Sequence, residues 1–494
     1  MRTTLFRRKR EPEAPGSVFN CFQSALALLR PGSIDSANES ERSKERLRRA
    51  ALTTIGSGTS KAISLLTSLV SVPLTYRYLG AERYGIWMVL ISIISAMSFA
   101  DLGIGNGLMN AISEAHGKDD RKMAREHVSS GLALMLSIAL MLTAIGALAY
   151  PFLPWPRLFN VKSQAAALEG ARAFLVLYAS FVINIPLGVV TRIQSGMQKA
   201  YVAQVVNGLG AVVSLLLILF VIWIHGSLAY LVLATVGTGI ASTLVNGWIL
   251  FRECPWLLPS MRAVRGTSAK KLLNLGLLFF VLQCSFTLAF TSDNIVIAQI
   301  LGAAAVAAYS VPQKLFSSVT AIVSTAVGPL WPAYGEAISR GDVRWVRRVF
   351  MGSLWLVLTI SIPLCTLLAI AGPWILKIAV GKTFHAPVAL LIALAIWGVV
   401  NSVSVVVSVL LNGASILKQQ TWLAVVVGVS NLLISIFLTK RFGVIGVCLG
   451  SILAQLLITF PTYVLLLRRM FDRLSNLTPT PVFVENISAK LETT

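Results

Sequence analysis

Four ionisable side chains stand inside long apolar runs of this sequence: Lys61, Asp101, Asp293 and Lys314. A charge at the centre of a bilayer costs roughly 2.5–3.5 kcal/mol on insertion scales, so such residues avoid lipid. One interpretation is a hydrated cavity whose lysines meet an anionic cargo. The alternative is internal ion pairing, for instance of Asp293 with Lys314, that holds helices in register. For Asp101, beside the glycines of 103–107, a short acid that satisfies unwound backbone is an equal alternative.

Further polar residues follow one another toward the end of the fourth apolar run. Asn184, Arg192 and Gln194 lie there, close to Pro186, which interrupts helical hydrogen bonding. Polar groups at membrane depth face protein or water rather than lipid. We therefore include these three residues, with Lys61 and Lys314, among the candidates for a substrate cavity.

Residues for enzymatic chemistry are sparse. The chain has four histidines and five scattered cysteines, and no HExxH, GxSxG or Walker sequence. No catalytic residue, metal site or cofactor is therefore predicted, and the chain has no nucleotide site of its own. The dispersed cysteines also argue against a disulfide framework.

Composition indicates which solvent surrounds these residues. Hydrophobic residues make up 56% of the 494 and charged residues 13%, and the mean hydropathy is +0.76. A soluble domain has roughly 45–50% and about 25%. The net charge of +22 sits in tails and short loops between apolar runs. This placement is typical of loops retained in the cytoplasm and argues against a nucleic-acid partner.

Twelve apolar runs are long enough to span a membrane as helices, since crossing takes about twenty residues. They lie near 51–77, 84–108, 127–151, 167–190, 203–224, 228–251, 272–300, 305–333, 346–372, 384–411, 421–439 and 443–467. The fold class predicted is therefore an all-α integral membrane protein of about twelve transmembrane helices.

Both ends of the chain differ from this pattern. Residues 1–50 are basic and are predicted to form a largely disordered cytoplasmic tail, with a surface helix near 18–29. Residues 469–494 are predicted to form a second cytoplasmic tail. Lys and Arg crowd the loops at 118–125, 192–199, 252–271 and 340–348 and are fewer in the alternate loops. This bias predicts that both termini are cytoplasmic.

An internal repeat underlies the twelve runs. Features in the first half recur 222 residues later. The pairs are LGA at 79–81 with LGA at 301–303, Glu114 with Glu336, Asp120 with Asp342, and Arg125 with Arg347. We predict two pseudo-symmetric six-helix lobes, at 51–251 and 272–468, joined by a cytoplasmic linker at 252–271. Parallel repeats of this kind are a transporter architecture with the cargo path between the halves.

Several stretches resemble bacterial polysaccharide flippases of the Wzx type, in the multidrug/oligosaccharidyl-lipid/polysaccharide exporter superfamily. They are YRYLGAERYGIWM at 76–88, FADLGIGNGLMNAISEAHG at 99–117, INIPLGVVTRIQSGMQ at 183–198, Asn246-Gly247 and Pro255-Trp256. The likeness covers about 51–470 and is strongest in the first half. The long basic N-terminal tail departs from the pattern and leaves room for a regulatory contact.

The resemblance implies a MATE-like fold whose lobes enclose a cavity that opens alternately to each side of the inner membrane. The implied cargo is an undecaprenyl-diphosphate-linked saccharide, whose lipid tail stays among the membrane lipids. A polysaccharide polymerase and export machinery are implied as further partners. In such a cavity, Lys61 and Lys314 are candidates to neutralise the cargo. Asp101 and Asp293 are candidates for coupling to an H⁺ or Na⁺ gradient.

Two other functions compete with this one. A drug or metabolite antiporter on the same fold shares nearly all of these features. A membrane enzyme, such as a polysaccharide polymerase or ligase, generally needs a large outer loop. The longest outer loop predicted here is 151–166, which disfavours the enzyme.

Overall fold

The computed structural model describes residues 39–96, 100–152, 164–380 and 387–477, and within these ranges the ordered elements are helices. The long elements are α2 (Glu39–Ala96), α3 (Ile104–Gly117), α4 (Arg121–Ala149), α6 (Gln164–Gly196), α7 (Ala200–Trp223), α8 (Leu228–Glu253), α9 (Gly266–Leu301), α10 (Ala303–Val327), α11 (Leu330–Ser339), α12 (Val343–Val380), α13 (Val388–Gly413), α14 (Leu417–Phe442), α15 (Ile445–Ala454) and α16 (Phe460–Leu477). Short 3₁₀ turns lie at Tyr150–Phe152, Pro255–Leu257 and Met261–Ala263, and a π-helical turn at Gln455–Thr459 joins α15 to α16.

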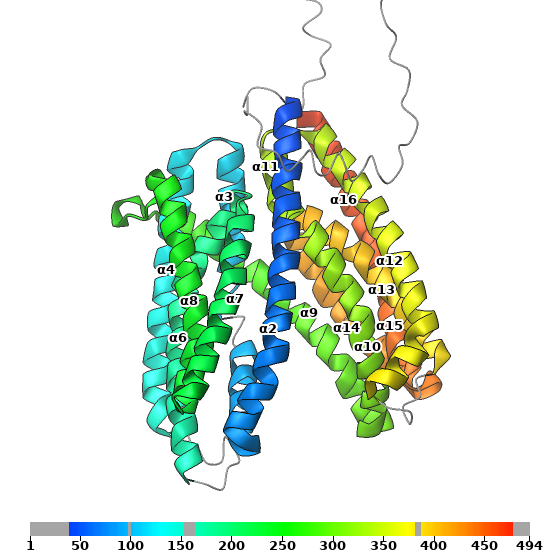
Figure 1. The fold of residues 1–494 in the computed structure, drawn as a ribbon. Helices are drawn as coiled ribbons and strands as arrows, with labels where there is room; N and C mark the ends of the chain where they lie inside the picture. The colour runs from blue at the N-terminus through cyan, green and yellow to red at the C-terminus, as the bar shows by residue number, and fades with distance from the viewer. Residues whose placement is uncertain (1–38, 97–99, 153–163, 381–386, 478–494) are drawn as a thin grey trace, which may run out of the picture.

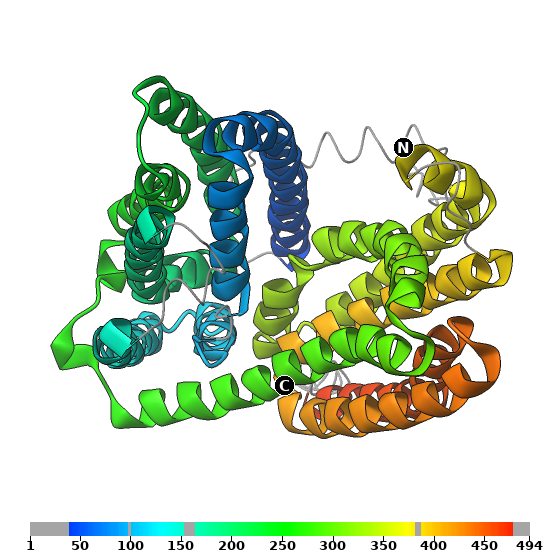
Figure 2. The ribbon, with the colours of Figure 1, turned by 90° about the horizontal axis from the view of Figure 1, so that it is seen from below.

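The helices form two lobes that diverge from one end of the molecule (Figure 1). The N-lobe comprises α2 to α8 and the C-lobe comprises α9 to α16. Seen from below, α9 leaves the N-lobe side and crosses to the C-lobe (Figure 2). Its contacts agree, since α9 packs against α3 and α4 as well as against α10 and α14. The described chain therefore has the two-lobed arrangement that the repeat predicts.

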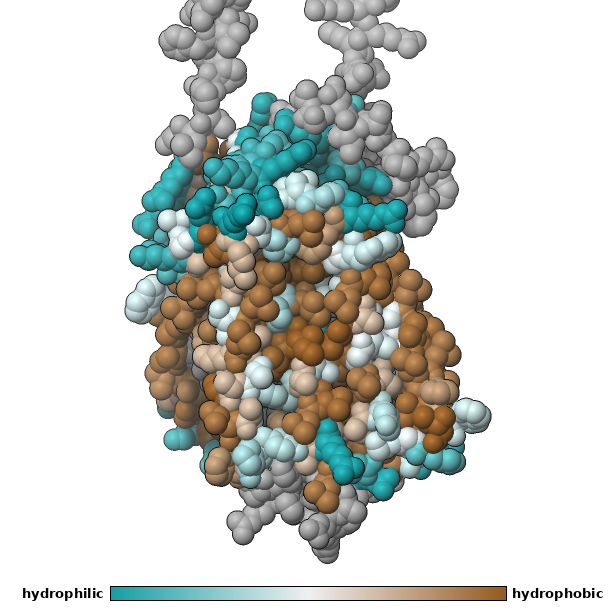
Figure 3. Space-filling view, turned by 90° about the vertical axis from the view of Figure 1, so that its left-hand side faces the viewer, coloured by the Kyte–Doolittle hydropathy of each residue, from teal (hydrophilic) through white to brown (hydrophobic). Residues whose placement is uncertain are grey.

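The outer surface is that of a membrane protein. Within the described residues, nine helical segments are long and apolar enough to cross a membrane. The remaining predicted spans, 51–77, 84–108 and 272–300, fall on the 58-residue α2, the start of α3 and the 36-residue α9. Large apolar side chains such as Leu148 and Ile370 are more than 70% exposed. Figure 3 shows an apolar band below a polar cap, which is the distribution that a bilayer requires.

The 222-residue repeat is present in the backbone as well as in the sequence. Gly80 has φ 73° and ψ 173°, and Gly302 has φ 89° and ψ 164°. This conformation is essentially restricted to glycine, and in each lobe it marks the joint between two consecutive helices. The offset also relates the ends of α3 and α11, at 117 and 339, and the starts of α4 and α12, at 121 and 343.

One predicted span is broken within the described residues. Span 84–108 is interrupted, because α2 ends at Ala96 and α3 begins only at Ile104. Predicted span 305–333 matches the candidate span Ala308–Ser339, which contains a short turn at Gly328 and Pro329 between α10 and α11.

The predicted tails and linker are also too long. Helix α2 begins at Glu39, so residues 39–50 are helical and include the buried Arg46. Helix α16 continues through 469–477, and α9 begins at Gly266 inside the predicted linker. Helical caps at these ends carry charged faces that a hydropathy pattern does not register. The predicted surface helix near 18–29 lies outside the described residues.

One end of the bundle carries most of the basic residues of the described chain. Helices α2, α4, α9 and α12 begin there, and α3, α6, α8, α11 and α16 finish there. We refer to it as the basic end. The cations that gather in this region include Arg42, Lys44, Arg46, Arg48, Arg49, Lys118, Arg121, Lys122, Arg125, Lys199, Arg252, Arg262, Arg265, Lys270, Lys271, Arg340, Arg344, Arg347, Arg348, Lys418, Arg468, Arg469 and Arg473.

Candidate functional site

Polar contacts join the two lobes at the basic end, where α3 meets α11 and the end of α13. Nδ2 of Asn110 donates to the backbone oxygen of Asn412 at 2.8 Å, and Nε1 of Trp331 donates to Oδ1 of Asn110 at 2.6 Å. Oγ of Ser113 donates to the backbone oxygen of Pro332 at 2.6 Å. Each bond links an N-lobe residue to a C-lobe residue. We refer to these contacts and the ion network beside them as the inter-lobe seal.

Glu336 of α11 is the centre of that ion network. Its carboxylate accepts from Nε of Arg46 at 3.2 Å and from Nε of Arg340 at 2.8 Å, and Nε2 of Gln198 also donates to it. Nη1 of Arg46 lies 2.7 Å from Oδ2 of Asp342. Arg46 is 3% exposed and Glu336 is 6% exposed. Arg46 and Gln198 belong to the N-lobe and Glu336 belongs to the C-lobe, so this buried charge network holds the two lobes together at the basic end.

The outer rim of the seal is a second ion pair across the lobes. Nη1 and Nη2 of Arg340 donate to the two carboxylate oxygens of Asp119 at 2.8 and 3.0 Å. The hydrogen bond from Arg340 lowers the pKa of the Asp119 carboxyl, and the same bond raises the pKa of Arg340. Nη2 of Arg340 also donates to the backbone oxygen of His116 at 3.1 Å. Arg340 therefore links the buried network to the solvent-exposed edge.

Lys61 lies between the lobes, farther along α2 than the seal residue Arg46. Its Nζ donates to Oγ1 of Thr325 on α10 at 2.6 Å. About two turns earlier on α2, Oγ1 of Thr54 donates to the backbone oxygen of Ala326 at 3.2 Å. Lys61 is fifteen residues beyond Arg46, roughly 22 Å along a helix. The side chain of Lys61 is exposed, and its hydrogen bond joins α2 of the N-lobe to α10 of the C-lobe.

Lys314 and Asp293 do not form the ion pair considered above. Oδ2 of Asp293 accepts from the hydroxyl of Tyr309 at 3.1 Å, and Asp293 is 5% exposed. Lys314 is exposed and lines a cavity of about 370 Å³ together with Gln313 and Asn401. Asp293 lines a neighbouring cavity inside the C-lobe. The pairing alternative is therefore wrong for these two residues.

A cavity of about 460 Å³ in the N-lobe brings Asp101, Asn184 and Arg192 together. Nη1 of Arg192 donates to Oδ1 of Asn106 at 2.7 Å. Oδ1 of Asp101 accepts from the backbone nitrogen of Gly103 at 3.0 Å. Asp101 therefore accepts a backbone hydrogen bond in the unwound stretch before α3, and it also lines the N-lobe cavity. The cavity interpretation and the backbone interpretation of Asp101 each describe part of its environment.

Gln194 occupies a different position from its two predicted companions. It is 1% exposed and is not among the residues that line the N-lobe cavity. Since 100° separates consecutive helical residues, Gln194 lies about 200° around α6 from Arg192. The sequence analysis grouped Gln194 with Asn184 and Arg192 because they are close along the chain, but the helix directs Gln194 to a different side.

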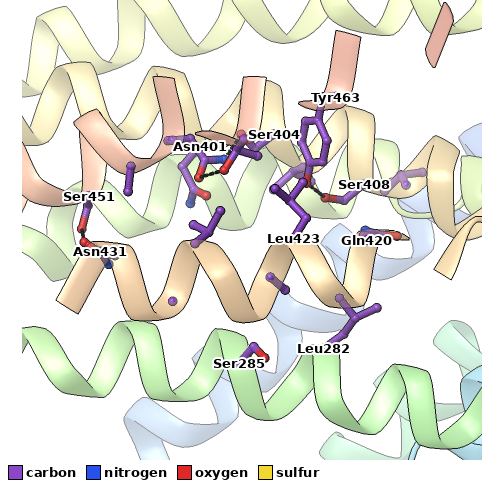
Figure 4. A pocket seen from close by; sticks show the side chains of 18 of the residues that line it. Leu282, Ser285, Asn401, Ser404, Ser408, Gln420, Leu423, Asn431, Ser451 and Tyr463 are labelled. Carbon is purple, nitrogen blue, oxygen red and sulfur yellow. Dashed lines mark hydrogen bonds between the residues drawn. The ribbon is translucent and has the colours of Figure 1, made fainter. Parts of the chain in front are cut away.

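Sequence reasoning missed a second lobe cavity. A space of about 330 Å³ inside the C-lobe is lined by amide, hydroxyl and aromatic side chains (Figure 4). A signal for it is present in the chain, because Asn401, Ser404, Ser408 and Asn412 recur at the three- and four-residue spacing of one helix face. The apolar residues between them satisfied the membrane-span pattern and concealed this polar stripe.

Within the part of the chain that the structure describes, no three His, Cys, Asp or Glu side chains gather into a group able to hold a metal ion. The candidate charged residues instead divide between the seal, the contact of α2 with α10, the N-lobe cavity and the two C-lobe cavities that Asp293 and Lys314 line. The arrangement suits binding and release of a charged, polar molecule between two lobes.

Comparison with known sequences indicates a family. A model of the family described as "Polysaccharide biosynthesis protein" matches residues 53–337. A Salmonella typhi protein named as an O-antigen transporter is 22% identical over 423 residues, covering 84% of this chain and 95% of that protein. A Yersinia pseudotuberculosis protein named for O-antigen export is 21% identical over 347 residues, covering 69% and 78%.

Comparison with solved structures shows the fold. A MATE structure in a bent conformation aligns with a TM-score of 0.75 at 17% identity, covering 92% of this chain and 98% of that one. An outward-facing multidrug resistance MATE family transporter of the MOP superfamily aligns with a TM-score of 0.73 at 18% identity, covering 92% and 99%. The chain therefore has the MATE-like membrane fold that was expected.

Replacing Arg46 should open the seal. Removing one partner of a buried ion pair costs about 3–5 kcal/mol, and Arg46→Ala imposes this cost on the sealed state, where Glu336 is out of water. Spin labels at Lys122 and Arg344, introduced in a cysteine-free background, should move apart in double electron–electron resonance distance distributions. Arg48→Ala is the matched control, since Arg48 pairs with Glu45 on its own helix. Unchanged distances in Arg46→Ala would show that the network does not hold the lobes.

Acidification should also weaken the seal, through His116. Burial lowers the pKa of this imidazole, and the positive charges of Arg49 and Arg340 lower it further. The negative charges of Glu336 and Asp119 raise it, but the net shift is downward. The open state, in which His116 meets water, therefore binds more protons below about pH 6.5. Between pH 7.5 and 5.5 the wide-distance population of the same label pair should grow. In His116→Gln this growth should shrink, and an identical pH response would assign the effect to another group.

Proposed function

Because the chain belongs to the polysaccharide biosynthesis protein family, we propose that it flips an undecaprenyl-diphosphate-linked saccharide repeat unit across the bacterial inner membrane. The observation that carries this proposal is the inter-lobe seal at one end of a two-lobed membrane bundle. Charged side chains lie beyond it, between and within the lobes. The names of the Salmonella and Yersinia relatives support polysaccharide repeat units as the class of cargo.

The proposed mechanism is alternating access. The lobes meet at the basic end and diverge toward the other end, so this structure corresponds to the state closed at the basic end (Figure 1). Opening the seal while the lobes close at the far end would expose the intervening space to the opposite side. The seal suits such a cycle because its contacts are mostly polar, and water can satisfy these groups when they separate.

The proposed orientation follows from charge. Loops rich in Lys and Arg remain in the cytoplasm, so the basic end would face the cytoplasm and both termini would lie there. The state described here would then be open toward the periplasmic side. The saccharide head would enter from the cytoplasm when the seal opens and leave at the far side, where polymerase and export machinery act.

The cargo has two chemically different parts. A diphosphate is anionic, and Lys61, Lys314 and Arg192 supply cations within reach of a head group between the lobes, while the isoprenoid tail stays in lipid. Asp101 and Asp293 are proposed to couple transport to an H⁺ or Na⁺ gradient, because acidic side chains within membrane segments commonly mark ion pathways and proton relays. No enzymatic step is included in this mechanism.

A drug or metabolite antiporter is the competing function, since the solved structures of the same fold include multidrug transporters. Deletion of the gene in its own host should abolish the corresponding surface polysaccharide and cause lipid-linked repeat units to accumulate on the cytoplasmic side. Immunoblots of the surface glycan and mass spectrometry of extracted lipids measure both, and a plasmid copy should restore them. Normal export in a deletion strain without a substitute gene would overturn the proposal. Drug resistance on overexpression, with unchanged glycan, would favour the antiporter.

The lysines give a second test. Lys61→Ala and Lys314→Ala should each reduce surface-polysaccharide export about tenfold, because a hydrogen bond to a charged group contributes about 1.5–3 kcal/mol. Lys61→Arg should retain much of the activity. Lys440→Ala, at the far end of α14, is the matched control for loss of one positive charge. Export is scored against the amount of folded protein in the membrane. Wild-type export by both alanine variants would place the cationic site elsewhere.

A further inference from the structure

The cavity inside the C-lobe differs in chemistry from the cationic sites just described. Among the described residues that line it, Asp293 alone carries a formal charge, and the other polar groups are amides and hydroxyls. We propose that this cavity is a saccharide subsite, which binds sugar rings of the cargo while the diphosphate is held outside it. This inference rests on the proposed function and specifies where the protein would recognise the sugar of its cargo.

Three residues that line the cavity carry buried hydrogen-bond acceptors that have no partner among the described residues. Oε1 of Gln420, Oδ1 of Asn412 and Oδ1 of Asp293 are buried and unbonded within the described structure, and Gln420 is 3% exposed. A buried acceptor left unpaired costs about 1–3 kcal/mol. Hydroxyl groups are donors of the kind that these oxygens lack, and a saccharide carries several around each ring. A phosphate offers acceptors instead and would leave all three unsatisfied.

Other polar side chains on the wall are already positioned by one another. The hydroxyls of Ser408 and Tyr463 lie 3.0 Å apart, and Oγ of Ser451 donates to Oδ1 of Asn431 at 3.2 Å (Figure 4). Such pairs fix side-chain orientations before a ligand arrives, which lowers the entropic cost of binding. The residues of the wall therefore combine a preorganised polar frame with three acceptors that have no partner within the described structure.

Aromatic rings complete the chemistry expected of a sugar site. Trp331, Trp397 and Tyr463 line the same cavity. Sugar rings have apolar C–H faces and polar edges, and aromatic side chains with one polar atom match that combination. The volume of about 330 Å³ is at the small end of ligand pockets, which suits part of a repeat unit rather than the whole.

The neighbouring cavity offers a place for the anionic end of the cargo. Ser324, Trp397 and Asn401 line both this cavity and the one that contains Lys314. A ligand that spans the shared wall would place sugar against amides and hydroxyls and phosphate toward the ammonium. The carboxylate of Asp293 disfavours the reverse orientation because it would face the phosphate charge.

Two wall residues also belong to the inter-lobe seal. Trp331 donates to Asn110, and Asn110 donates to the backbone oxygen of Asn412. A sugar bonded to Oδ1 of Asn412 or packed on Trp331 contacts the residues that hold the lobes together. Binding that differs between the sealed and open states shifts their populations, so occupancy of this cavity is linked to gating.

Binding of two lipids to the full-length protein in nanodiscs tests the subsite. The probes are undecaprenyl diphosphate carrying the host saccharide, extracted from host cells, and undecaprenyl diphosphate without sugar. The wild type should bind the first more tightly. Gln420→Leu should weaken that binding about tenfold and leave the bare lipid unaffected, since the unpaired acceptor is removed from the sugar site alone.

Gln419→Leu is the matched control, because Gln419 is exposed and is not among the cavity-lining residues. Asn401→Leu is a second subsite variant if Gln420→Leu lowers the melting temperature. Unchanged preference for the sugar-bearing lipid in folded Gln420→Leu and Asn401→Leu would overturn the subsite and leave the flippase function standing. Equal wild-type affinity for both lipids would also overturn it. Binding of neither lipid by the wild type would overturn the proposed function and the subsite together.

Discussion

The buried carboxylate of Glu336 constrains how the lobes can meet. A carboxylate removed from water costs several kcal/mol unless charged partners and hydrogen-bond donors surround it. Two of its donors, Arg46 and Gln198, come from the other lobe. Arg46 can reach Glu336 only because α2 begins well before the part of the helix that spans the membrane. The guanidinium of Arg46 also lies 5.2 Å from the centroid of the Trp345 ring. To deliver Gln198, α6 must end, and this residue takes a positive φ of 57° just past the helix.

The same acid illustrates how the two halves have diverged on one backbone. The repeat relates Glu336 to Glu114, but Glu114 bonds Lys118 and Lys271 in a half-exposed position. These bonds outweigh burial and lower the pKa of Glu114. Likewise, Asp120 caps α4 by accepting from the backbone nitrogen of Met123, while its counterpart Asp342 pairs with Arg46. Duplication preserved the turns and helix starts, and the charges on them acquired different partners.

The two lobe cavities show a comparable difference. The N-lobe cavity contains a guanidinium and a carboxylate, Arg192 and Asp101, whereas the C-lobe cavity has no cation among its described lining residues and combines amides and hydroxyls with aromatic and aliphatic side chains. A molecule with a charged linkage and a neutral polar head presents both kinds of chemistry. Two pseudo-symmetric lobes with unequal linings can therefore recognise one asymmetric molecule, which identical lobes would not do as well. The difference lies in side chains, since the helices that carry them correspond.

The sequence by itself determined the helical membrane fold, the repeat and the cationic character of one end, because lipid requires long apolar helices and each span must satisfy its own backbone. It also identified Asp101, Asn184 and Arg192, which one cavity gathers. Only the tertiary structure decided the partners of buried polar groups. The sequence around Arg46 predicts a solvated tail, whereas in the structure Arg46 is buried beside Glu336, 290 residues away. Asp293 took Tyr309 rather than Lys314, and the C-lobe cavity drew its lining from several helices. Periodicity reports which face of a helix is polar, whereas the group that meets that face depends on how separate helices pack.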